Sequence, residues 1–288
     1  MLKQKQKSNS SASKVTPGSV LRGVLALTVT VIMVFPLYWM LATALKTEAE
    51  VMSSTITFWP AVPQFENFSY VMNKVPFFRY MLNTAIITVM QMASELCLGI
   101  LAAYAFSKGK FHGKHLLFLL VLGAMMIPIQ VTFIPLYITM ARIGMMNTYW
   151  GVWIAGCVSS YAIFLLRQAF MTIDDSYLEA ARVDGMNKLA VLFNIMVPMC
   201  KPTVITVGLT SFMGAWNNYF WPKVIIKQQD MYVLTVGVQR LRTSYGGEIT
   251  NNYHQIMAGV LMSIIPVFIV FAIFQKHILS GYTKAAMK

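Results

Sequence analysis

The sequence predicts an all-α integral membrane protein with six transmembrane helices, and three observations support this prediction. Hydrophobic residues make up 57% of the 288 residues and charged residues only 11%, whereas an ordinary soluble domain carries about 25% charged residues. The apolar residues fall into separate runs, several of which reach the roughly 20 residues that cross a hydrocarbon core about 30 Å thick. The basic residues flank these runs, as topology determinants do, so the net charge of +13 does not indicate nucleic acid.

Six runs are long enough to span a membrane. We expect the spans at residues 20–45, 82–106, 116–138, 149–166, 203–220 and 256–278. Residues 1–19 are polar and serine-rich, which predicts a disordered cytoplasmic segment before a six-span domain at 20–288. A cleaved signal peptide is the alternative for the first run, because a basic leader precedes it. The run is longer than a signal core of about 7–15 residues, which favours an uncleaved helix.

The charges of the connecting segments predict the orientation. With the N-terminus inside, 15 of the 23 Lys and Arg residues lie in the leader, at 108–114, at 167–201 and in the tail, and the remaining 8 lie outside. Positive residues stay preferentially on the cytoplasmic side, so we expect both termini in the cytoplasm. The long outer loops are then 46–81 and 222–255, and the inner loop is 167–201.

The inner loop carries the strongest local signals. Ser176 and Glu179 have the spacing of a capping box, which predicts a helix start. Gly185 suits the end of that helix, because glycine adopts positive φ at low cost, and Asn187 suits the N-cap of a second helix. A helix pair of this kind on the cytoplasmic surface could dock into a groove of another protein. A loop with two solvated helices explains the pattern equally well.

This loop resembles the signature loop of permease subunits of binding-protein-dependent ABC importers. The signature reads Glu-Ala-Ala, three residues, Gly, nine residues, Ile, one residue, Leu-Pro. The matching residues are Glu179, Ala180, Ala181, Gly185, Ile195 and Pro198. Asp184 lies directly before the glycine and belongs to the same loop. Valine stands at position 197, where the signature has leucine.

The chain from about residue 20 onward resembles the sugar-importer branch of that family, in particular its maltose-type second permease. The segments that carry the resemblance are 36–40, 45–47, 102–106, 126–128, 134–137, 147–149, 164–168 and 216–222. Two departures are Asp174-Asp175, where the branch usually has Pro-Lys, and Asn218, which is often acidic in relatives.

The resemblance implies the fold, the mechanism and the partners. The fold would be that of a type I ABC importer permease, with residues 179–185 as a coupling helix that enters a cleft of a cytoplasmic ATPase. The partners would be a second similar permease, two ATPase subunits and an extracytoplasmic sugar-binding protein, assembled in the bacterial cytoplasmic membrane. ATP and magnesium would be bound by the ATPase, so we expect no cofactor, metal or catalytic site in this chain. The cargo would be a carbohydrate, and the branch favours an oligosaccharide.

Several residues are candidates for the transport pathway. Glu95 lies midway along the second span, where an ionisable group is costly and suggests a function. It could line a sugar path or hydrogen-bond between helices as a structural group. Trp216, Asn217 and Asn218 lie at the outer end of the fifth span, where aromatic rings and amides could contact a sugar. An interfacial aromatic belt is the competing explanation, and we favour it for Trp221.

The outer loop 222–255 exceeds the roughly 15 residues beyond which loops are usually functional. Its polar and charged residues suit a reversible contact with the binding protein, although a plain connection is the alternative. The candidates for this contact are Gln239, Arg240, Arg242 and Tyr245.

Other function classes lack support in the sequence. The segment 109–115 is one residue short of a phosphate-binding loop and lacks its Ser or Thr. The three cysteines show no metal-ligand spacing, and no catalytic constellation indicates a membrane enzyme. A proton-coupled carrier that uses Glu95 is the remaining alternative. Such carriers show inverted repeats and broken helices, and the sequence predicts neither.

Overall fold

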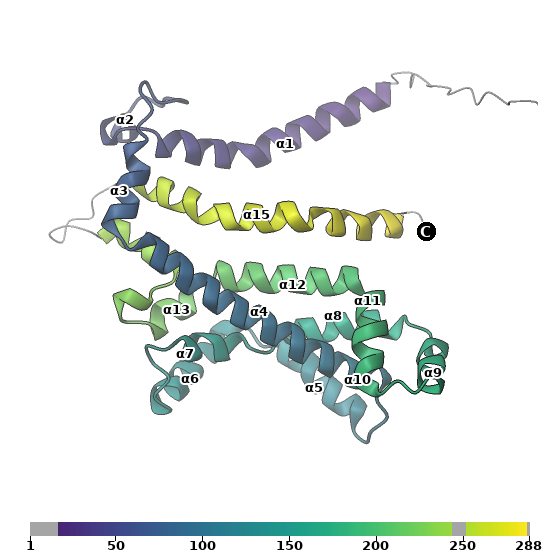
Figure 1. Cartoon of the computed structure of the whole chain (residues 1–288). Helices are drawn as coiled ribbons and strands as arrows, with labels where there is room; N and C mark the ends of the chain where they lie inside the picture. Colours follow the sequence, from purple (N-terminus) through teal and green to yellow (C-terminus); the bar gives the residue numbers. More distant parts are fainter. Residues whose placement is uncertain (1–16, 244–251, 287–288) are drawn as a thin grey trace, which may run out of the picture.

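The computed structural model describes residues 17–243 and 252–286, and within these ranges the chain is helical without strands (Figure 1). Three helices are single, apolar and long enough to cross a membrane: α1 (Pro17–Ala44), α4 (Phe77–Lys108) and α15 (Tyr253–Ala286). The all-α prediction is confirmed. The first helix begins at Pro17, inside the segment 1–19 that we expected to be disordered, and residues 1–16 lie outside the described part.

The remaining spans are bent pairs of helices. The first pair is α5 (Lys114–Met126) with α6 (Ile129–Arg142), bent by 98°. The second is α7 (Tyr149–Trp153) and η1 (Ile154–Gly156) with α8 (Ser160–Met171), bent by 44°. The third is α10 (Lys188–Val191), η2 (Leu192–Met196) and α11 (Val197–Met199) with α12 (Lys201–Trp216) and α13 (Phe220–Ile225), bent by 86°. By length and composition the described residues hold up to six spans if each pair counts as one.

The prediction of one continuous helix over 116–138 is wrong. The helix breaks at Ile127, because the ring of Pro128 disfavours helical backbone at the residue before it and proline lacks an N–H to donate. The two pieces have 13 and 14 residues, or about 20 Å each. Neither piece alone matches a hydrocarbon core of about 30 Å.

The fourth and fifth spans also differ from their predicted bounds. The fourth begins at Tyr149 as expected, but it is interrupted before Ser159, whose hydroxyl accepts a hydrogen bond from Ala162 N and starts α8. The fifth ends at Trp216, and Phe220 belongs to the separate helix α13. The expectation that broken helices are absent was therefore also wrong.

The bundle has two distinct ends. In Figure 1 the start of α1, the end of α15 and helix α9 (Asp175–Val183) lie on one side, which we call the α9 end. Helices α2 (Glu48–Met52) and α3 (Glu66–Lys74) lie on the opposite side together with α13. The turns and helices that follow α13 in the chain are η3 (Gln229–Met231), α14 (Leu234–Gln239) and η4 (Arg240–Thr243). We call this opposite side the α14 end.

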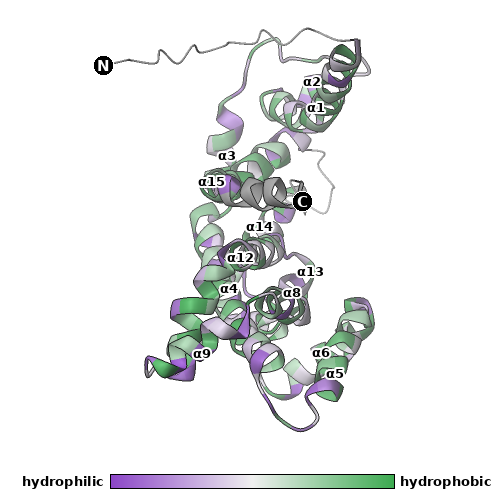
Figure 2. Ribbon diagram, turned by 90° about the vertical axis from the view of Figure 1, so that its right-hand side faces the viewer, coloured by the Kyte–Doolittle hydropathy of each residue, from purple (hydrophilic) through white to green (hydrophobic). Residues whose placement is uncertain are grey.

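Each end has its own hydrophobic cluster. One cluster surrounds the fully buried Tyr80 and includes Tyr232 of the α13–α14 connection and Leu234 of α14. The other surrounds Leu166 and Phe170 of α8 and includes residues of α9 and α10. Helix α1, in contrast, is exposed along most of its length, and Figure 2 shows its hydrophobic colouring. Such an apolar surface suits contact with lipid or another membrane helix.

Candidate functional site

Helix α9 starts at a different residue from the one that the sequence suggested. Asp174 has extended backbone and is the N-cap, because its Oδ1 accepts a hydrogen bond of 2.8 Å from Ser176 N. The capping box predicted from Ser176 and Glu179 is therefore wrong. The same hydrogen bond to the ionised carboxylate lowers the pKa of Asp174 below its ordinary value of 3.8. Asp174 thus has a structural role of its own at the start of α9.

The turn after α9 forms as predicted. Gly185 has φ of +81°, which favours glycine, and Met186 N donates to Ala181 O at 3.0 Å. This is the hydrogen bond of a Schellman motif, which satisfies a carbonyl at the helix end. Asn187 then caps the second helix, with Oδ1 accepting from Ala190 N at 2.8 Å. The second helix is irregular, because it passes through the π-helical turn η2 before Val197.

Helix α9 is attached to the bundle by one apolar face and one lysine. Leu178 and Ala181 are buried in the cluster around α8. The ammonium of Lys108, at the end of α4, lies 2.6 Å from Asp175 Oδ1 and donates to Ile173 O at 2.6 Å. Asp174 and Asp175, which stand where the sugar-importer branch usually has Pro-Lys, therefore both stabilise the start of α9 through contacts within the chain.

The opposite face of α9 is exposed. The exposed coupling candidates are Glu179 and Ala180 on this face and Asp184 and Gly185 directly after the helix, whereas Ala181, also predicted for coupling, is buried. Two large hydrophobic residues accompany them, Tyr177 at 55% exposure and Val183 at 88%. Ile195 is half-buried and Pro198 is exposed on the following helix. Exposed apolar side chains beside charged ones are typical of a surface that contacts another protein.

Glu95 lies in a polar cluster at the break in the fourth span. It is 8% exposed, and its Oε1 accepts a hydrogen bond of 2.9 Å from Gln91 Nε2. The Gln91 amide packs against Gly156 so closely that a Cβ there would come within 2.5 Å of Nε2. Trp153 Nε1 donates to Ser94 Oγ at 3.0 Å in the same cluster. Glu95 therefore bonds within α4 to Gln91, which itself contacts the α7–α8 break, and it lies apart from the other predicted pathway residues.

The aromatic and amide residues at the end of α12 divide between packing and exposure. Trp216 is buried and its Nε1 donates to Ser263 O at 3.2 Å, whereas Asn217 is exposed. Asn218 contributes its backbone carbonyl, which accepts a hydrogen bond of 2.7 Å from Thr235 Oγ1. Trp221 is buried and donates to Gly151 O at 3.1 Å. The aromatic-belt interpretation of Trp221 is therefore wrong, since its ring serves internal packing.

A cavity of about 260 Å³ lies between α12, α14 and α15, and we call it the α14 cavity. It brings Trp216 and Asn217, which were predicted for the pathway, together with Gln239, which was predicted for the binding-protein contact. Arg240 is turned to Tyr232, with its Nη2 donating to the hydroxyl at 2.8 Å. The side chain of Arg242 and all of Tyr245 lie outside the described part of the chain.

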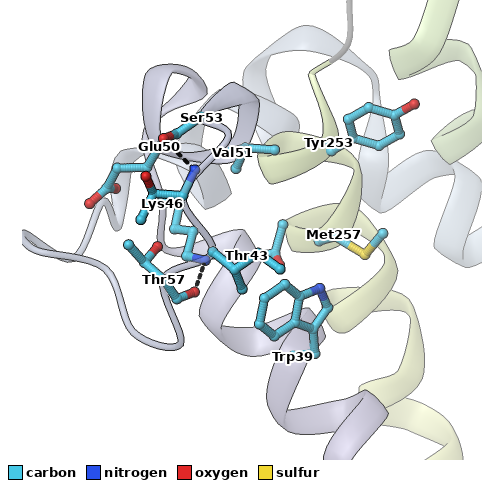
Figure 3. Close-up of a pocket in the computed structure, with 11 residues that line it drawn as sticks. Trp39, Thr43, Lys46, Glu50, Val51, Ser53, Thr57, Tyr253 and Met257 are labelled. Carbon is cyan, nitrogen blue, oxygen red and sulfur yellow. Dashed lines mark hydrogen bonds between the residues drawn. The ribbon is translucent and has the colours of Figure 1, made fainter.

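A second cavity, of about 230 Å³, lies between the end of α1, the segment after it and the start of α15 (Figure 3). Lys46 is only 3% exposed, donates to the carbonyl of Thr57 and lies 4.7 Å from the centre of the Trp39 ring. The carboxylate of Glu50 accepts from Ala61 N at 2.9 Å and from Thr47 N at 3.1 Å. These charges therefore hold the loop that forms the cavity.

None of the site residues that were predicted from the sequence and that the structure describes lines this second cavity. Thr47 and Glu50 form a capping box at the start of α2, and that spacing is visible in the sequence. Burial of Lys46 beside Trp39 has no comparable signal, because it depends on how the loop folds back on α1.

Comparison with known proteins covers most of the chain. The family model described as binding-protein-dependent transport system inner membrane component matches residues 95–284. An arabinooligosaccharides transport system permease protein of Halalkalibacterium halodurans is 31% identical over 89% of this chain and 92% of its own length. An sn-glycerol-3-phosphate transport system permease protein of Escherichia coli O6:K15:H31 is 28% identical over 87% of this chain and 90% of its own. A bacterial ABC transporter involved in import of the acidic polysaccharide alginate has a chain of the same fold, with a TM-score of 0.80 at 24% identity, covering 91% of this chain and 98% of that chain.

Proposed function

Because the chain belongs to the family of binding-protein-dependent transport system inner membrane components, we propose that it forms half of the pore of an ATP-driven carbohydrate importer. The family membership confirms the resemblance predicted from residues 179–198, and with it a multi-pass, non-catalytic permease subunit of an ABC importer. A relative that carries arabinooligosaccharides and covers most of this chain supports a carbohydrate cargo, with an oligosaccharide favoured.

The observation that carries the mechanism is the exposed face of α9. In the proposal a cytoplasmic ATPase docks on this face, and the ATPase binds the ATP and the magnesium. Closure of the ATPase moves α9, and the buried contacts of Leu178, Ala181 and Lys108 pass the movement to α8 and α4. The spans then exchange between inward-open and outward-open arrangements, whose populations the ATPase shifts.

The same proposal assigns the remaining partners. The α9 end would lie in the cytoplasm together with both chain termini, and the start of α1 and the end of α15 lie on the same side as α9 in Figure 1. A second permease would complete the pore, and two ATPase subunits would bind the pair. The α14 end would meet an extracytoplasmic sugar-binding protein through Gln239, Arg240, Arg242 and Tyr245. The pathway would include Trp216, Asn217 and Asn218, and Glu95 would line or support it.

Affinity purification from native membranes in mild detergent tests the assembly. We expect the chain to bring down an ATPase, a second six-span permease and a sugar-binding protein. Recovery of the chain alone, from membranes where it still supports uptake, would contradict the proposal and favour a carrier that works without an ATPase.

The energy source is tested separately, because the broken spans also suit a secondary carrier. We expect uptake to stop when ATP is depleted and to continue when a proton uncoupler is added. A Glu95→Gln variant should import at close to the normal rate, since the amide can keep the hydrogen bond to Gln91. Uptake that stops with the uncoupler and in Glu95→Gln would instead assign proton coupling to Glu95.

A further inference from the structure

The α14 cavity has the size of a subsite rather than of a complete ligand pocket. Its volume is about 260 Å³, below the roughly 300–1,000 Å³ of pockets that enclose a drug-sized ligand. It opens at the end of α12, where the exposed Asn217 and Gln239 form part of its lining. A cavity of this volume accommodates one ring of an oligosaccharide but not several.

The lining combines aromatic, amide and hydroxyl groups. Trp216 and Tyr219 supply the aromatic rings, and the side chains of Asn217 and Gln239 supply the amides. The hydroxyls of Thr235 and Ser263 donate to the carbonyls of Asn218 and Gly259, both at 2.7 Å. Their oxygens can therefore still accept hydrogen bonds from a ligand. Apolar walls with a few polar groups of this kind fix the orientation of a polyhydroxylated ligand.

None of the described residues that line this cavity carries a charge. The neighbouring cations are directed to tyrosines: Lys223 Nζ lies 2.6 Å from the Tyr219 hydroxyl, and Arg240 bonds the Tyr232 hydroxyl. The cavity of Figure 3 differs, because Lys46 and Glu50 both line it. An anionic ligand in the α14 cavity would lose its hydration without gaining a paired charge, which is costly.

We infer that the α14 cavity receives one uncharged sugar ring of the cargo as the cargo passes from the binding protein into the pore. The inference rests on the proposed function and adds to it the class of the substrate, a neutral oligosaccharide. Trp216 and Tyr219 provide the apolar wall, and Asn217 and Gln239 hydrogen-bond the ring hydroxyls.

The test uses the complete transporter in proteoliposomes, with the second permease, the ATPase and the binding protein. Radiolabelled arabinotriose and maltotriose serve as neutral probes, and glycerol 3-phosphate and glucose 1-phosphate as anionic probes. Import and ATP hydrolysis are measured together, so that loss of a sugar contact is separated from loss of coupling.

We expect import of a neutral probe. Asn217→Ala and Gln239→Ala should each lower the sugar imported per ATP hydrolysed by about fivefold, the loss of one hydrogen bond.

Gln228→Ala is the matched control, because Gln228 is an exposed amide at the same end that does not line the cavity. Unchanged import per ATP in both cavity variants, or the same loss in the control, would overturn the inference. Import of anionic probes alone would also overturn it while leaving the ATP-driven carbohydrate importer standing. ATP-dependent import of no probe by the intact transporter would contradict the carbohydrate cargo, and the inference with it.

Discussion

The two ends of this bundle are held together by different kinds of contact. At the α14 end, side chains of α4 bond the backbone of the α13–α14 connection: Asn83 Nδ2 donates to Asp230 O at 3.0 Å and to Tyr232 O at 2.9 Å. Thr84 Oγ1 accepts from Leu234 N at 2.7 Å. At the α9 end, the helix itself is attached through Leu178, Ala181 and Lys108, and the rest of its surface is open.

These two kinds of contact indicate which part of the chain can move. Bonds from buried side chains to backbone carbonyls are directional, and breaking one leaves a buried polar group without a partner. An apolar contact with one lysine tolerates small rotations at lower cost. The α14 end is therefore suited to keep a fixed shape toward its partner, and α9 is suited to move as a unit when its exposed face is pulled. Variants at Gly185, Asn83, Lys108 and Asp174 test this contrast.

Gly185→Arg should give the largest effect on transport. An arginine at φ of +81° costs about 1 kcal/mol in the left-handed region, and its side chain projects from the turn beside the proposed docking face. We expect membrane insertion to be retained and ATP-driven uptake to fall at least about tenfold, a loss of more than about 1.4 kcal/mol in coupling. Uptake and the amount of protein in the membrane are measured together.

Gly144→Arg is the matched control for that variant. Gly144 has φ of +72° and, like Gly185, has no atom within 4 Å of an added Cβ. The backbone strain is therefore the same, but the position lies between α6 and α7, far along the chain from α9. Equal loss of uptake in both variants would show that strain, and not the docking face, is responsible.

Asn83→Ala should give the largest effect on stability. The change leaves the carbonyls of Asp230 and Tyr232 and the hydroxyl of Tyr149, which donates to Asn83 Oδ1 at 2.8 Å, without this partner. We expect a loss of about 3 kcal/mol in the free energy of unfolding, measured by thermal denaturation in detergent. Asn73→Ala, at an exposed residue of α3, should change it little. Similar melting of both variants would mean that the α14 end is not held by these bonds.

Lys108→Met should weaken the attachment of α9 without unfolding the bundle. The methionine keeps the apolar stem but removes the bonds to Asp175 and to the carbonyl of Ile173. We expect uptake per ATP hydrolysed to fall by about threefold, close to the loss of one charge-assisted hydrogen bond at a partly exposed site. Lys110→Met, at an exposed lysine of the same turn, should leave the ratio unchanged. If Lys108→Met transports normally, the lysine does not transmit the movement.

The smallest effect concerns the pH dependence of the α9 cap. Because the pKa of Asp174 is lowered by its bond from Ser176 N, the cap contributes stability above the ordinary pKa of a free aspartate. That contribution is lost as the pH falls through the lowered pKa of the folded state. The protection of the α9 amides against hydrogen exchange, relative to an unfolded chain, should fall in acid in the wild type. It should not fall in Asp174→Asn, since asparagine caps without titrating. Identical acid profiles would contradict this account.

Parts of the fold follow from local sequence signals. Apolar runs of about 20 residues predict spans because hydrocarbon offers no hydrogen bonds to an open backbone. Gly185 and Asn187 predicted the turn after α9, since positive φ and N-capping depend on single residues. The position of the break at Pro128 could have been inferred by the same rule, but its angle of 98° could not. That angle depends on the packing of α5 and α6 against other elements.

Other features were misjudged because two local explanations competed. Ser176 and Asp174 can both cap α9, and the carboxylate of Asp174 is the group that reaches the backbone N–H. Trp221 fits an aromatic belt by its place in the sequence, but its ring is buried and bonds the backbone of Gly151. In each case a contact of the folded chain decided between the two explanations.

Local sequence signals were sufficient to assign the class of this protein. Its hydropathy predicted a multi-span helical bundle, and the spacing from Glu179 to Pro198 indicated the family. Both signals are local, because span length and turn chemistry are properties of short segments. The sequence did not indicate that Trp216, Asn217 and Gln239 share one uncharged cavity. It also did not indicate that Glu95 bonds Gln91 beside a helix break or that Lys108 holds α9. Those arrangements join residues of different helices or depend on side-chain direction, and only packing sets which groups meet.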